Sequence, residues 1–460
     1  MISEDRELAL APEDYSLLTD LYQLTMAACY VGEKIDQRQA SFELFVRKLP
    51  EGFGYLIAMG LAQALDYLEK FRFSAPQIAA LKSTGIFANA PDQFWSVLAE
   101  TKFTGDVWAV PEGTAIFPNQ PLLRIEAPLW QAQLVETYLL NTLNYQTLIA
   151  TKASRMRDVV GPNAQLLEFG TRRAFSPQAG VWAARAALAA GMDATSNVLA
   201  ALKLGRKPAG TMAHALVMAI SAVEGTEEDA FAAFHRYFPN APLLIDTFET
   251  VAAAKLLSQR VAQGKMQVTG VRLDSGDLAQ LSKEVRSLLP EVTIFASGDI
   301  DEWEIAKLQA ENACIDGYGI GTKLVTGFPV NGVYKLVEID GIPVMKKSSS
   351  KVTYPGRKQI YRYWENGQLK EDYLGLVNEE DVSDRTDQGL NYPIKLIELV
   401  VKAGKRVQEP ETLAAIAKRT AASVSSLPKE IRRLENPSLP PMKISQKLQE
   451  LTEKTQNQSF

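Results

Sequence analysis

Short apolar segments alternate with helical patterns between residues 166 and 322, and this alternation constrains the fold more than any other feature of the chain. Helical spacing of apolar residues occurs at 251–263, 278–289 and 302–309. Repeated strand–helix units of about 25 residues are typical of a parallel sheet or barrel, so the sequence predicts an α/β fold. The clearest predicted strands are 166–169, 243–245, 268–273, 293–296 and 315–318.

Sequences on both sides of this region predict a β-rich module that is discontinuous along the chain. Strand-like runs precede a long helical pattern at 130–160, and two hairpins follow residue 322, around Asp340-Gly341 and Asn366-Gly367. Asn-Gly is a strong hairpin signal, and we expect both hairpins to rejoin the N-terminal β-rich module. The predicted division is an N-terminal β-rich module with helices (1–150), an α/β barrel domain carrying the active site (151–325), hairpins (326–405) and a C-terminal helical extension (406–460).

Composition excludes several classes of partner. The net charge is −5, with 49 basic and 54 acidic residues well mixed, so no basic stripe predicts nucleic acid or membrane binding. Two cysteines, Cys29 and Cys314, form no framework or CxxC motif, which fits a reducing compartment. The acidic start is unlike a signal peptide, and no apolar run approaches 18 residues. We expect a cytoplasmic protein that binds small molecules.

Histidine is scarce, because the chain holds only His214 and His235. Two histidines cannot build a His-rich metal centre, so a single imidazole would act as base, nucleophile or phosphate carrier. His214, in the segment 210–214, is the better candidate, and its structural alternative is a neutral core histidine bonded to a carbonyl. His235 lies on an amphipathic pattern and is expected to be a packed surface residue.

Polar residues and glycines follow the predicted strands, and barrels gather functional groups at the carboxyl ends of their strands. The segment 319–322 can wrap backbone N–H groups around a phosphate, with the Thr322 hydroxyl as a further donor. Walker A spacing is absent, and so is G-x-G-x-x-G after the first strand. Asp, Ser and Gly also serve as caps and turns, so a ligand-free loop is the alternative for each cluster.

Charged residues at these strand ends suggest anionic ligands. Arg172 and Arg272 can bind carboxylates or phosphates through their guanidinium forks, and the alternative is an ion pair with Glu168 or Asp274. Four aspartates can hold sugar hydroxyls or Mg²⁺-bound water, but their spacing defines no direct metal cage. These aspartates are Asp246, Asp274, Asp277 and Asp299.

In combination, these motifs resemble those of the nicotinate phosphoribosyltransferases. The resemblance extends from about residue 15 to 376. It is carried by LTDLYQ (18–23), FELFVR (42–47), EFGTRR (168–173), GTMAH (210–214), VRLDSGDL (271–278) and GIGT (319–322).

The resemblance implies a type II phosphoribosyltransferase fold, in which an irregular α/β barrel joins a discontinuous β-rich second domain. It implies a homodimer with shared active sites. The implied reaction joins nicotinate to 5-phosphoribosyl 1-diphosphate and gives nicotinate mononucleotide and pyrophosphate for NAD biosynthesis. ATP is an implied co-substrate, and Mg²⁺ would be carried by the pyrophosphate or ATP rather than by direct protein ligands.

The resemblance also implies roles for single residues. His214 would be the phosphohistidine, Tyr22, Thr211 and Arg272 would contact nicotinate, and Thr322 would contact the phosphoribosyl group. Other residues lie at the ends of predicted strands, and we expect some of them to contact phosphate groups and others to contact ribose hydroxyls or Mg²⁺-bound water. The added phosphate contacts are Gly319, Gly321, Arg172, Ser275 and Gly298, and the ribose or water contacts are Asp274, Asp246 and Asp299.

Four alternatives differ in substrate or class. A quinolinate enzyme would need more cations for the second carboxylate, and a nicotinamide enzyme would gain nothing from a carboxylate fork at Arg272. A type I phosphoribosyltransferase is disfavoured because the apolar run at 243–247 ends in only one acid. A barrel that binds phosphorylated metabolites without turnover would have no use for a phosphorylatable His214.

Overall fold

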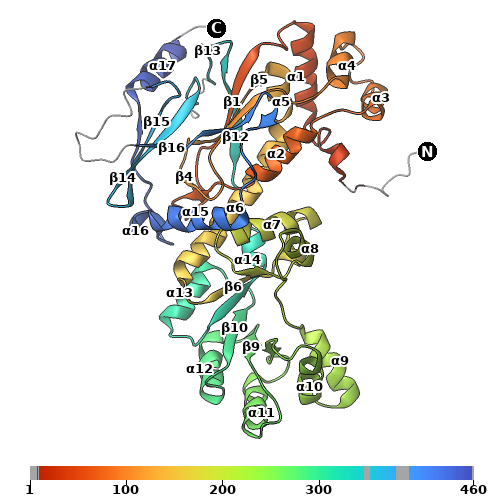
Figure 1. Cartoon of the computed structure of the whole chain (residues 1–460), viewed down its shortest axis with the longest axis vertical. Coiled ribbons are helices and arrows are strands. Elements are labelled where there is room, and N and C mark those ends of the chain that lie inside the picture. The colour runs from red at the N-terminus through yellow and green to blue at the C-terminus, as the bar shows by residue number, and fades with distance from the viewer. Residues whose placement is uncertain (1–7, 9, 347–352, 380–392, 458–460) are drawn as a thin grey trace. The chain divides into compact units, whose positions relative to one another are not determined.

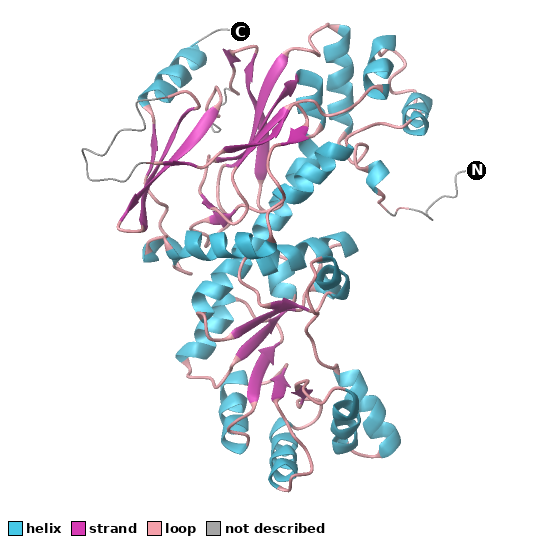
Figure 2. Cartoon of the chain, in the orientation of Figure 1, coloured by secondary structure: helices cyan, strands magenta, loops and turns pink. Residues whose placement is uncertain are grey.

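The computed structural model describes residues 8, 10–346, 353–379 and 393–457, and the chain forms two compact units. Unit 1 contains residues 1–148, 329–412 and 425–460, and unit 2 contains residues 149–328 and 413–424. The boundary near residue 148 falls within the long helix α6 (Glu136–Val160). Figures 1 and 2 show the elements of both units.

Unit 1 is built on an antiparallel seven-stranded sheet whose strand order is β13-β12-β1-β5-β3-β17-β18. Its strands are β1 (Gln39–Val46), β3 (Asp106–Ala109), β5 (Pro121–Pro128), β12 (Gly332–Ile339), β13 (Ile342–Pro343), β17 (Glu398–Lys402) and β18 (Lys405–Arg406). A four-stranded sheet contains β16 (Ile394–Lys395), β14 (Lys358–Glu365), β15 (Gln368–Leu376) and β19 (Met442–Ile444), and a small sheet contains β2 (Leu56–Ile57) and β4 (Ala115–Ile116).

Helices cover parts of these sheets. They are η1 (Pro12–Asp14), α1 (Leu21–Gly32), α2 (Leu61–Lys70), α3 (Ala75–Ser83), α4 (Asp92–Ala99), α5 (Leu129–Leu134), α16 (Lys429–Arg432) and α17 (Gln446–Asn457). Strand β1 is an interior strand of the large sheet, where it pairs with β5 on one side and with β12 on the other. Segments nearly 300 residues apart in sequence, such as Ala40 and Ile339, are therefore direct neighbours.

Both predicted hairpins are confirmed. Asn366 and Gly367 have φ of 52° and 80° and connect the paired residues Glu365 and Gln368. Asp340-Gly341, with φ of 48° and 78°, makes the same kind of turn between β12 and β13. Two consecutive positive φ values are the geometry of a type I′ turn, which matches the right-handed twist of the strands.

Gly367→Ala is expected to lower the free energy of unfolding by about 1–2 kcal/mol, because alanine at φ 80° is strained while nothing within 4 Å would contact its Cβ. Urea unfolding measures this change. Gly32→Ala, at the end of α1, is the matched control, since its nearest neighbour lies 3.9 Å away and its φ is not positive. Equal destabilisation by the two variants would contradict the backbone argument.

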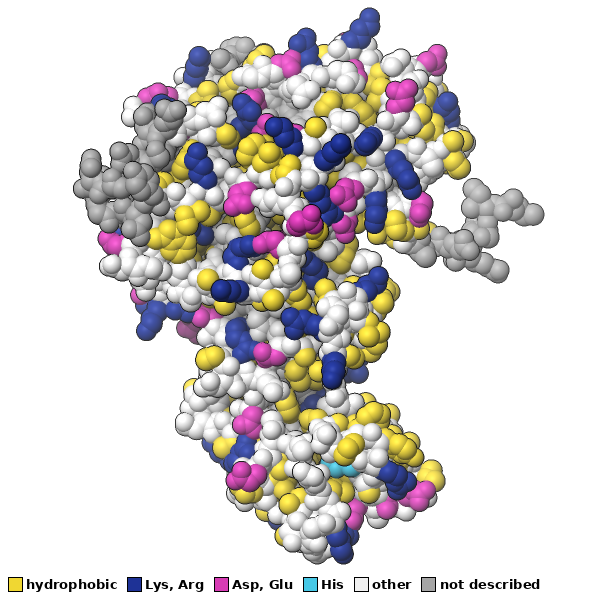
Figure 3. Space-filling model, in the orientation of Figure 1, with side chains coloured by type: hydrophobic (Ala, Val, Ile, Leu, Met, Phe, Trp, Pro, Cys, Tyr) yellow, Lys and Arg dark blue, Asp and Glu magenta, His cyan; other side chains and the backbone are white. Residues whose placement is uncertain are grey.

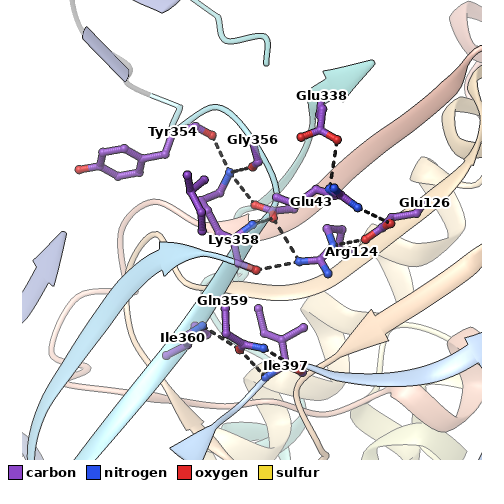
Figure 4. Close-up of polar contacts among 12 residues, drawn as sticks. Glu43, Arg124, Glu126, Glu338, Tyr354, Gly356, Lys358, Gln359, Ile360 and Ile397 are labelled. Atoms are coloured by element: carbon purple, nitrogen blue, oxygen red, sulfur yellow. Dashed lines mark hydrogen bonds and ion pairs between the residues drawn. The ribbon is translucent and has the colours of Figure 1, made fainter. Parts of the chain in front are cut away.

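A buried ion network joins β14 to β1 in unit 1 (Figure 4). The Lys358 Nζ donates to the carbonyls of Tyr354 (2.6 Å) and Gly356 (2.7 Å) and lies 2.9 Å from Glu43 Oε2. Burial lowers the pKa of Lys358, and the Glu43 carboxylate opposes that shift. Arg124 donates to the Lys358 carbonyl at 2.7 Å. Because these charges are hydrogen-bonded, the segment from Tyr354 to Lys358 is held firmly against β1.

Unit 2 contains a six-stranded parallel sheet whose order runs from β7 through β6, β11, β10 and β9 to β8. The five predicted strands are confirmed, and β7 is an additional short strand that the sequence reading missed. The strands are β6 (Gln165–Glu168), β7 (Ala194–Thr195), β8 (Leu243–Leu244), β9 (Gly270–Leu273), β10 (Thr293–Ser297) and β11 (Gly317–Ile320).

Helices connect these strands, and the three predicted ones are confirmed as α11 (Thr250–Ala262), α12 (Leu278–Leu288) and α13 (Glu302–Ala310). Asp277, one of the four candidate aspartates, accepts a hydrogen bond from the Gln280 N–H and is therefore the N-cap of α12. The other helices are η2 (Thr171–Arg173), α7 (Pro177–Ala189), α8 (Val198–Lys203), α9 (His214–Glu224), α10 (Glu227–Tyr237), α14 (Thr322–Val325) and α15 (Leu413–Ser425).

The last predicted strand lies two residues later than expected. Gly319 and Ile320 belong to β11, so only Gly321 and Thr322 follow the strand. A Cβ on Gly319 would come within 2.5 Å of the Phe169 ring. The glycine is therefore required by packing inside the sheet, which a pattern of loop residues could not reveal.

On the face shown in Figure 3, basic and acidic side chains are interspersed. Within the described ranges, no helix is long and apolar enough to cross a membrane. The same residues contain no group of three or more His, Cys, Asp or Glu side chains placed to hold a metal ion.

Candidate active site

Residues at the carboxyl ends of β8, β9 and β10 meet in unit 2. The Asp246 carboxylate accepts hydrogen bonds from the Asp274 N–H (2.8 Å) and the Ser275 hydroxyl (2.7 Å) through one oxygen, Oδ2. Its other oxygen, Oδ1, is buried without a hydrogen-bond partner among the described residues. Parallel strands place their carboxyl ends at one edge of the sheet, which is why residues 28 apart in sequence touch here.

Arg272 lies at the centre of this cluster. Its Nη1 donates to Asp274 Oδ1 (3.0 Å) and Ser297 Oγ (3.1 Å), and its Nη2 donates to the Met212 carbonyl (2.7 Å). The ion pair with Asp274, considered above as an alternative to ligand binding, is therefore present. The Nε of Arg272 is nevertheless buried with no partner in the described part of the chain. An unsatisfied guanidinium N–H at a buried position is costly unless a ligand accepts its hydrogen bond.

Burial lowers the pKa of Arg272, Arg172 lowers it further, and Asp274 and Asp246 oppose the shift. Arginine stays protonated despite such shifts. Arg172, in the turn after β6, makes the smallest of these contributions.

His214 is the first residue of α9, after the N-cap Ala213. Its Nδ1 lies 3.1 Å from Thr247 Oγ1, its Nε2 lies 4.0 Å from Asp274 Oδ2, and its side chain is 40% exposed. The imidazole is thus accessible and is hydrogen-bonded to a hydroxyl, which does not match a core histidine bonded to a carbonyl. His235, in contrast, has Nε2 3.1 Å from the Ala241 carbonyl.

Thr211 shapes the segment before His214. Its hydroxyl donates to the Pro242 carbonyl at 2.7 Å and accepts from the Met212 N–H. The same segment delivers the Met212 carbonyl to Arg272. The hydrogen bonds of Thr211 therefore hold the segment before α9 in place. The Thr211 hydroxyl both donates and accepts within the protein.

The remaining candidates lie at the ends of β6, β10 and β11. Arg172 is exposed in η2, Thr322 begins α14, and Gly321 precedes it with its Cβ position 3.2 Å from the Phe169 carbonyl. Gly298 directly follows β10. Its φ is 91°, and a Cβ at this position would overlap the Asp274 carbonyl. Only glycine fits that position, so the end of β10 lies directly against the loop after β9. Asp299 follows it and is exposed.

Tyr22 belongs to unit 1, where it is the second residue of α1. Its side chain is about half exposed, and burial together with Glu136 and Asp20 raises the pKa of its hydroxyl. The phenol is therefore neutral at physiological pH, and the ring retains an accessible aromatic face.

Three contacts in this cluster were not predicted from the sequence. Thr247 bonds His214, the buried Ser297 bonds Arg272 and Asp274, and the Met212 carbonyl accepts from Arg272. Thr247 and Ser297 lie at strand ends, and this position in the sequence could have identified them as candidate site residues. The role of the Met212 carbonyl could not be predicted from the residue type, because every residue has a backbone carbonyl and its contacts depend on the path of the chain.

Glu227, at the start of α10, adds a titrating group near Asp246. Burial, and then Asp246 and Glu249, raise its pKa to about 7, while one of its oxygens has no partner among the described residues. The Glu227 carboxyl group therefore binds its proton more tightly in the folded protein than in the unfolded chain. Stability from this group is fully present below the unfolded pKa near 4.5 and is lost as the pH rises towards 7.

Glu227→Gln should therefore raise the stability of the protein at pH 8 and leave it little changed at pH 4.5. Because the side chain is partly exposed, the expected gain at pH 8 is roughly 1 kcal/mol. Thermal unfolding at both pH values measures it, with Glu228→Gln as the neighbouring control, since Glu228 already pairs with Arg260 at 2.5 Å. A gain in stability that is the same at pH 4.5 and pH 8 would contradict the raised pKa of Glu227.

Comparisons with known proteins agree along most of the chain. The nicotinate phosphoribosyltransferase N-terminal domain matches residues 17–144, the nicotinate phosphoribosyltransferase family matches 164–362, and the nicotinate phosphoribosyltransferase C-terminal domain matches 357–452. A nicotinate phosphoribosyltransferase of Mycobacterium tuberculosis is 40% identical over 92% of this chain and 89% of its own. That of Bacillus subtilis is 38% identical over 96% and 95%, respectively.

A solved structure supports the same assignment. The crystal structure of human nicotinic acid phosphoribosyltransferase superposes with a TM-score of 0.82 at 30% identity, covering 95% of this chain and 99% of the human one. Sequence identity of this size over nearly the full length of both proteins requires common ancestry and a common fold. The chain belongs to the nicotinate phosphoribosyltransferase family.

Proposed function

We propose that this protein joins nicotinate to 5-phosphoribosyl 1-diphosphate, giving nicotinate mononucleotide and pyrophosphate for NAD biosynthesis, with ATP hydrolysis coupled through a phosphohistidine at His214. The observation that carries the proposal is the buried, unpartnered Nε of Arg272, a carboxylate-binding donor held near an exposed histidine. Family membership supports the same reaction. We further propose that the parallel sheet closes into an irregular barrel of the type II kind and that the protein is a homodimer with shared active sites.

Arg272 would bind the nicotinate carboxylate. Nη1 donates to Asp274 and Ser297, Nη2 donates to Met212, and Nε has no partner among the described residues. The edge formed by Nε and Nη2 therefore keeps two donors for a bidentate carboxylate. The pyridine nitrogen then remains unprotonated and free to attack the anomeric carbon of the ribose. Thr211 would shape the nicotinate pocket, and the Tyr22 ring has the flat aromatic face that stacks on a pyridine.

Transfer of the ribosyl group breaks the bond from the anomeric carbon to the diphosphate and builds positive charge on the ribose. The proposed phosphate contacts are Arg172, Gly298, Ser275, Gly321 and Thr322. Asp246, Asp274 and Asp299 would hold ribose hydroxyls or Mg²⁺-bound water. The unpartnered Oδ1 of Asp246 fits this outer-sphere role. Mg²⁺ carried by the diphosphate would neutralise charge on the leaving group.

His214 would take the γ-phosphoryl group of ATP on its imidazole. Its position at the first residue of α9 favours this modification, since the N-terminus of a helix stabilises negative charge. The added charge would lie near the carboxylate of Asp274, which is 4.0 Å from the ring. We propose that the resulting rearrangement of the cluster tightens substrate binding.

A direct test follows the stoichiometry of the reaction. Purified protein with nicotinate, 5-phosphoribosyl 1-diphosphate and Mg²⁺ should form one nicotinate mononucleotide for each pyrophosphate, and ADP should accumulate when ATP is present. The alternatives are a quinolinate or nicotinamide enzyme and a non-catalytic phosphometabolite-binding barrel. Binding of the diphosphate substrate without any pyrophosphate release would favour the non-catalytic barrel and refute the proposal.

A further inference from the structure

Glu168 is a fully buried carboxylate that the proposed reaction does not use. It ends β6, its side chain is 0% exposed, and no ion pair to it is found within the described ranges. Its two oxygens accept hydrogen bonds from different places: Oε1 from the Gly170 N–H, and Oε2 from the Thr195 hydroxyl. Burial raises the pKa of Glu168, and these two hydrogen bonds oppose the shift.

These hydrogen bonds join two loops at the carboxyl edge of the parallel sheet. On one side, the Gly170 carbonyl accepts from the Arg173 N–H at 2.8 Å, so Gly170 anchors the turn η2 that carries Arg172. On the other side, Thr195 ends β7 and its hydroxyl accepts from the Asn197 N–H at 2.9 Å. Asn197 in turn caps α8. The carboxylate thus fixes η2 relative to the start of α8.

A third loop packs against the same point. A Cβ on Gly170 would overlap a methyl group of Val325 and come within 2.9 Å of Glu168 Oε1. Val325 is the last residue of the short helix α14, whose first residue is Thr322. Turn η2 and helix α14 are therefore in direct contact, and β6, α8 and α14 lie in the same part of unit 2 (Figure 1). The carboxylate stands where the loops that carry Arg172 and Thr322 meet.

An apolar side chain would fill the same space without the cost of burying a carboxylate. Glu168 instead supplies two hydrogen-bond acceptors to groups that would otherwise be buried and unsatisfied. We propose that Glu168 is a positioning residue for the phosphoribosyl site, holding the loops of Arg172 and Thr322 in the relative placement that binds a phosphate of 5-phosphoribosyl 1-diphosphate. This inference rests on the proposed function.

The test compares Glu168→Met, which has similar volume and no strong acceptor, with Glu168→Gln. Gln can still accept from the Gly170 N–H through its oxygen and donate to Thr195 through its nitrogen. Glu168→Met should raise the KM for 5-phosphoribosyl 1-diphosphate by about 10-fold or more, with the KM for nicotinate within about twofold of wild type. Glu168→Gln should restore the diphosphate KM to within about threefold of wild type. Inhibition by pyrophosphate should weaken in parallel with the diphosphate KM.

Thr195→Val removes one of the two donors and provides a milder variant if Glu168→Met does not fold. It should raise the same KM by about threefold, and Thr195→Ser should restore it. Asp193→Ala is the control: Asp193 accepts from the Leu166 N–H at 2.7 Å, at the opposite end of β6, and should lower stability with no selective loss of diphosphate affinity.

The proposal is overturned if Glu168→Met raises both KM values equally or only lowers the amount of folded enzyme, as a purely structural residue would. It is also overturned if Glu168→Gln is as defective as Glu168→Met, because the negative charge and not the acceptor would then be required. Absence of transfer by the wild-type protein would instead refute the proposed function, so the two failures are distinguishable.

Discussion

Arg272→Ala is expected to raise the KM for nicotinate by about 10- to 150-fold, equivalent to losing a charge-assisted hydrogen-bonded pair of about 1.5–3 kcal/mol. The reason is that the Nε and Nη2 edge is the part of the guanidinium left for a ligand carboxylate. The variant should also lose its preference for nicotinate over nicotinamide, since the two pyridines differ in the group that this edge binds. Initial rates over a range of both pyridines measure the effect.

Two further variants separate charge from geometry. Arg272→Lys keeps a cation but cannot form the fork, so it should recover only part of the affinity. Arg286→Ala removes an arginine that pairs with Asp316 at 2.5 Å near the amino ends of β10 and β11, and its KM for nicotinate should match that of wild type. If Arg272→Ala kept the wild-type preference for nicotinate, the carboxylate-fork assignment would be wrong.

His214→Ala should abolish the stimulation of transfer by ATP while leaving a slow ATP-independent reaction. Since the imidazole would act as the phosphate carrier and not as a nucleophile towards ribose, the ratio of rates with and without ATP should fall to about one. Acid-labile, base-stable phosphate from γ-labelled ATP should appear in the wild-type protein and be absent from the variant.

His235→Ala is the matched control, because His235 is the other histidine of the sequence and bonds a carbonyl in the same unit. It should retain both the labelling and the stimulation by ATP. Equal stimulation of His214→Ala and wild type would remove His214 from the coupling mechanism.

The repeating units of unit 2 were predictable because each strand and helix has its own local signal. The run at 293–296 became β10, and the helical spacing at 251–263 became α11. The turns at Asn366-Gly367 and Asp340-Gly341 follow from backbone preferences of two residues each. Such features depend on few neighbours in sequence, so a single chain is enough to predict them.

Features that depend on contacts between distant residues were not predictable in the same way. Gly319 was expected in a phosphate loop, but it lies in β11, where the Phe169 ring leaves no space for a Cβ. Glu168 was considered as an ion-pair partner of Arg172, yet it bonds Gly170 and Thr195, and Thr195 lies on the unforeseen strand β7. Arg272 was identified, but which of its nitrogens remain free depends on the path of the backbone at Met212.

The most direct test of the account measures mononucleotide and pyrophosphate together, from 5-phosphoribosyl 1-diphosphate and Mg²⁺, with nicotinate, nicotinamide or quinolinate in turn. Each reaction is run with and without ATP. We expect turnover with nicotinate far above that with the other two pyridines, and a higher rate when ATP is present. Preferential turnover of nicotinamide or quinolinate, or no turnover with any of the three, would contradict it.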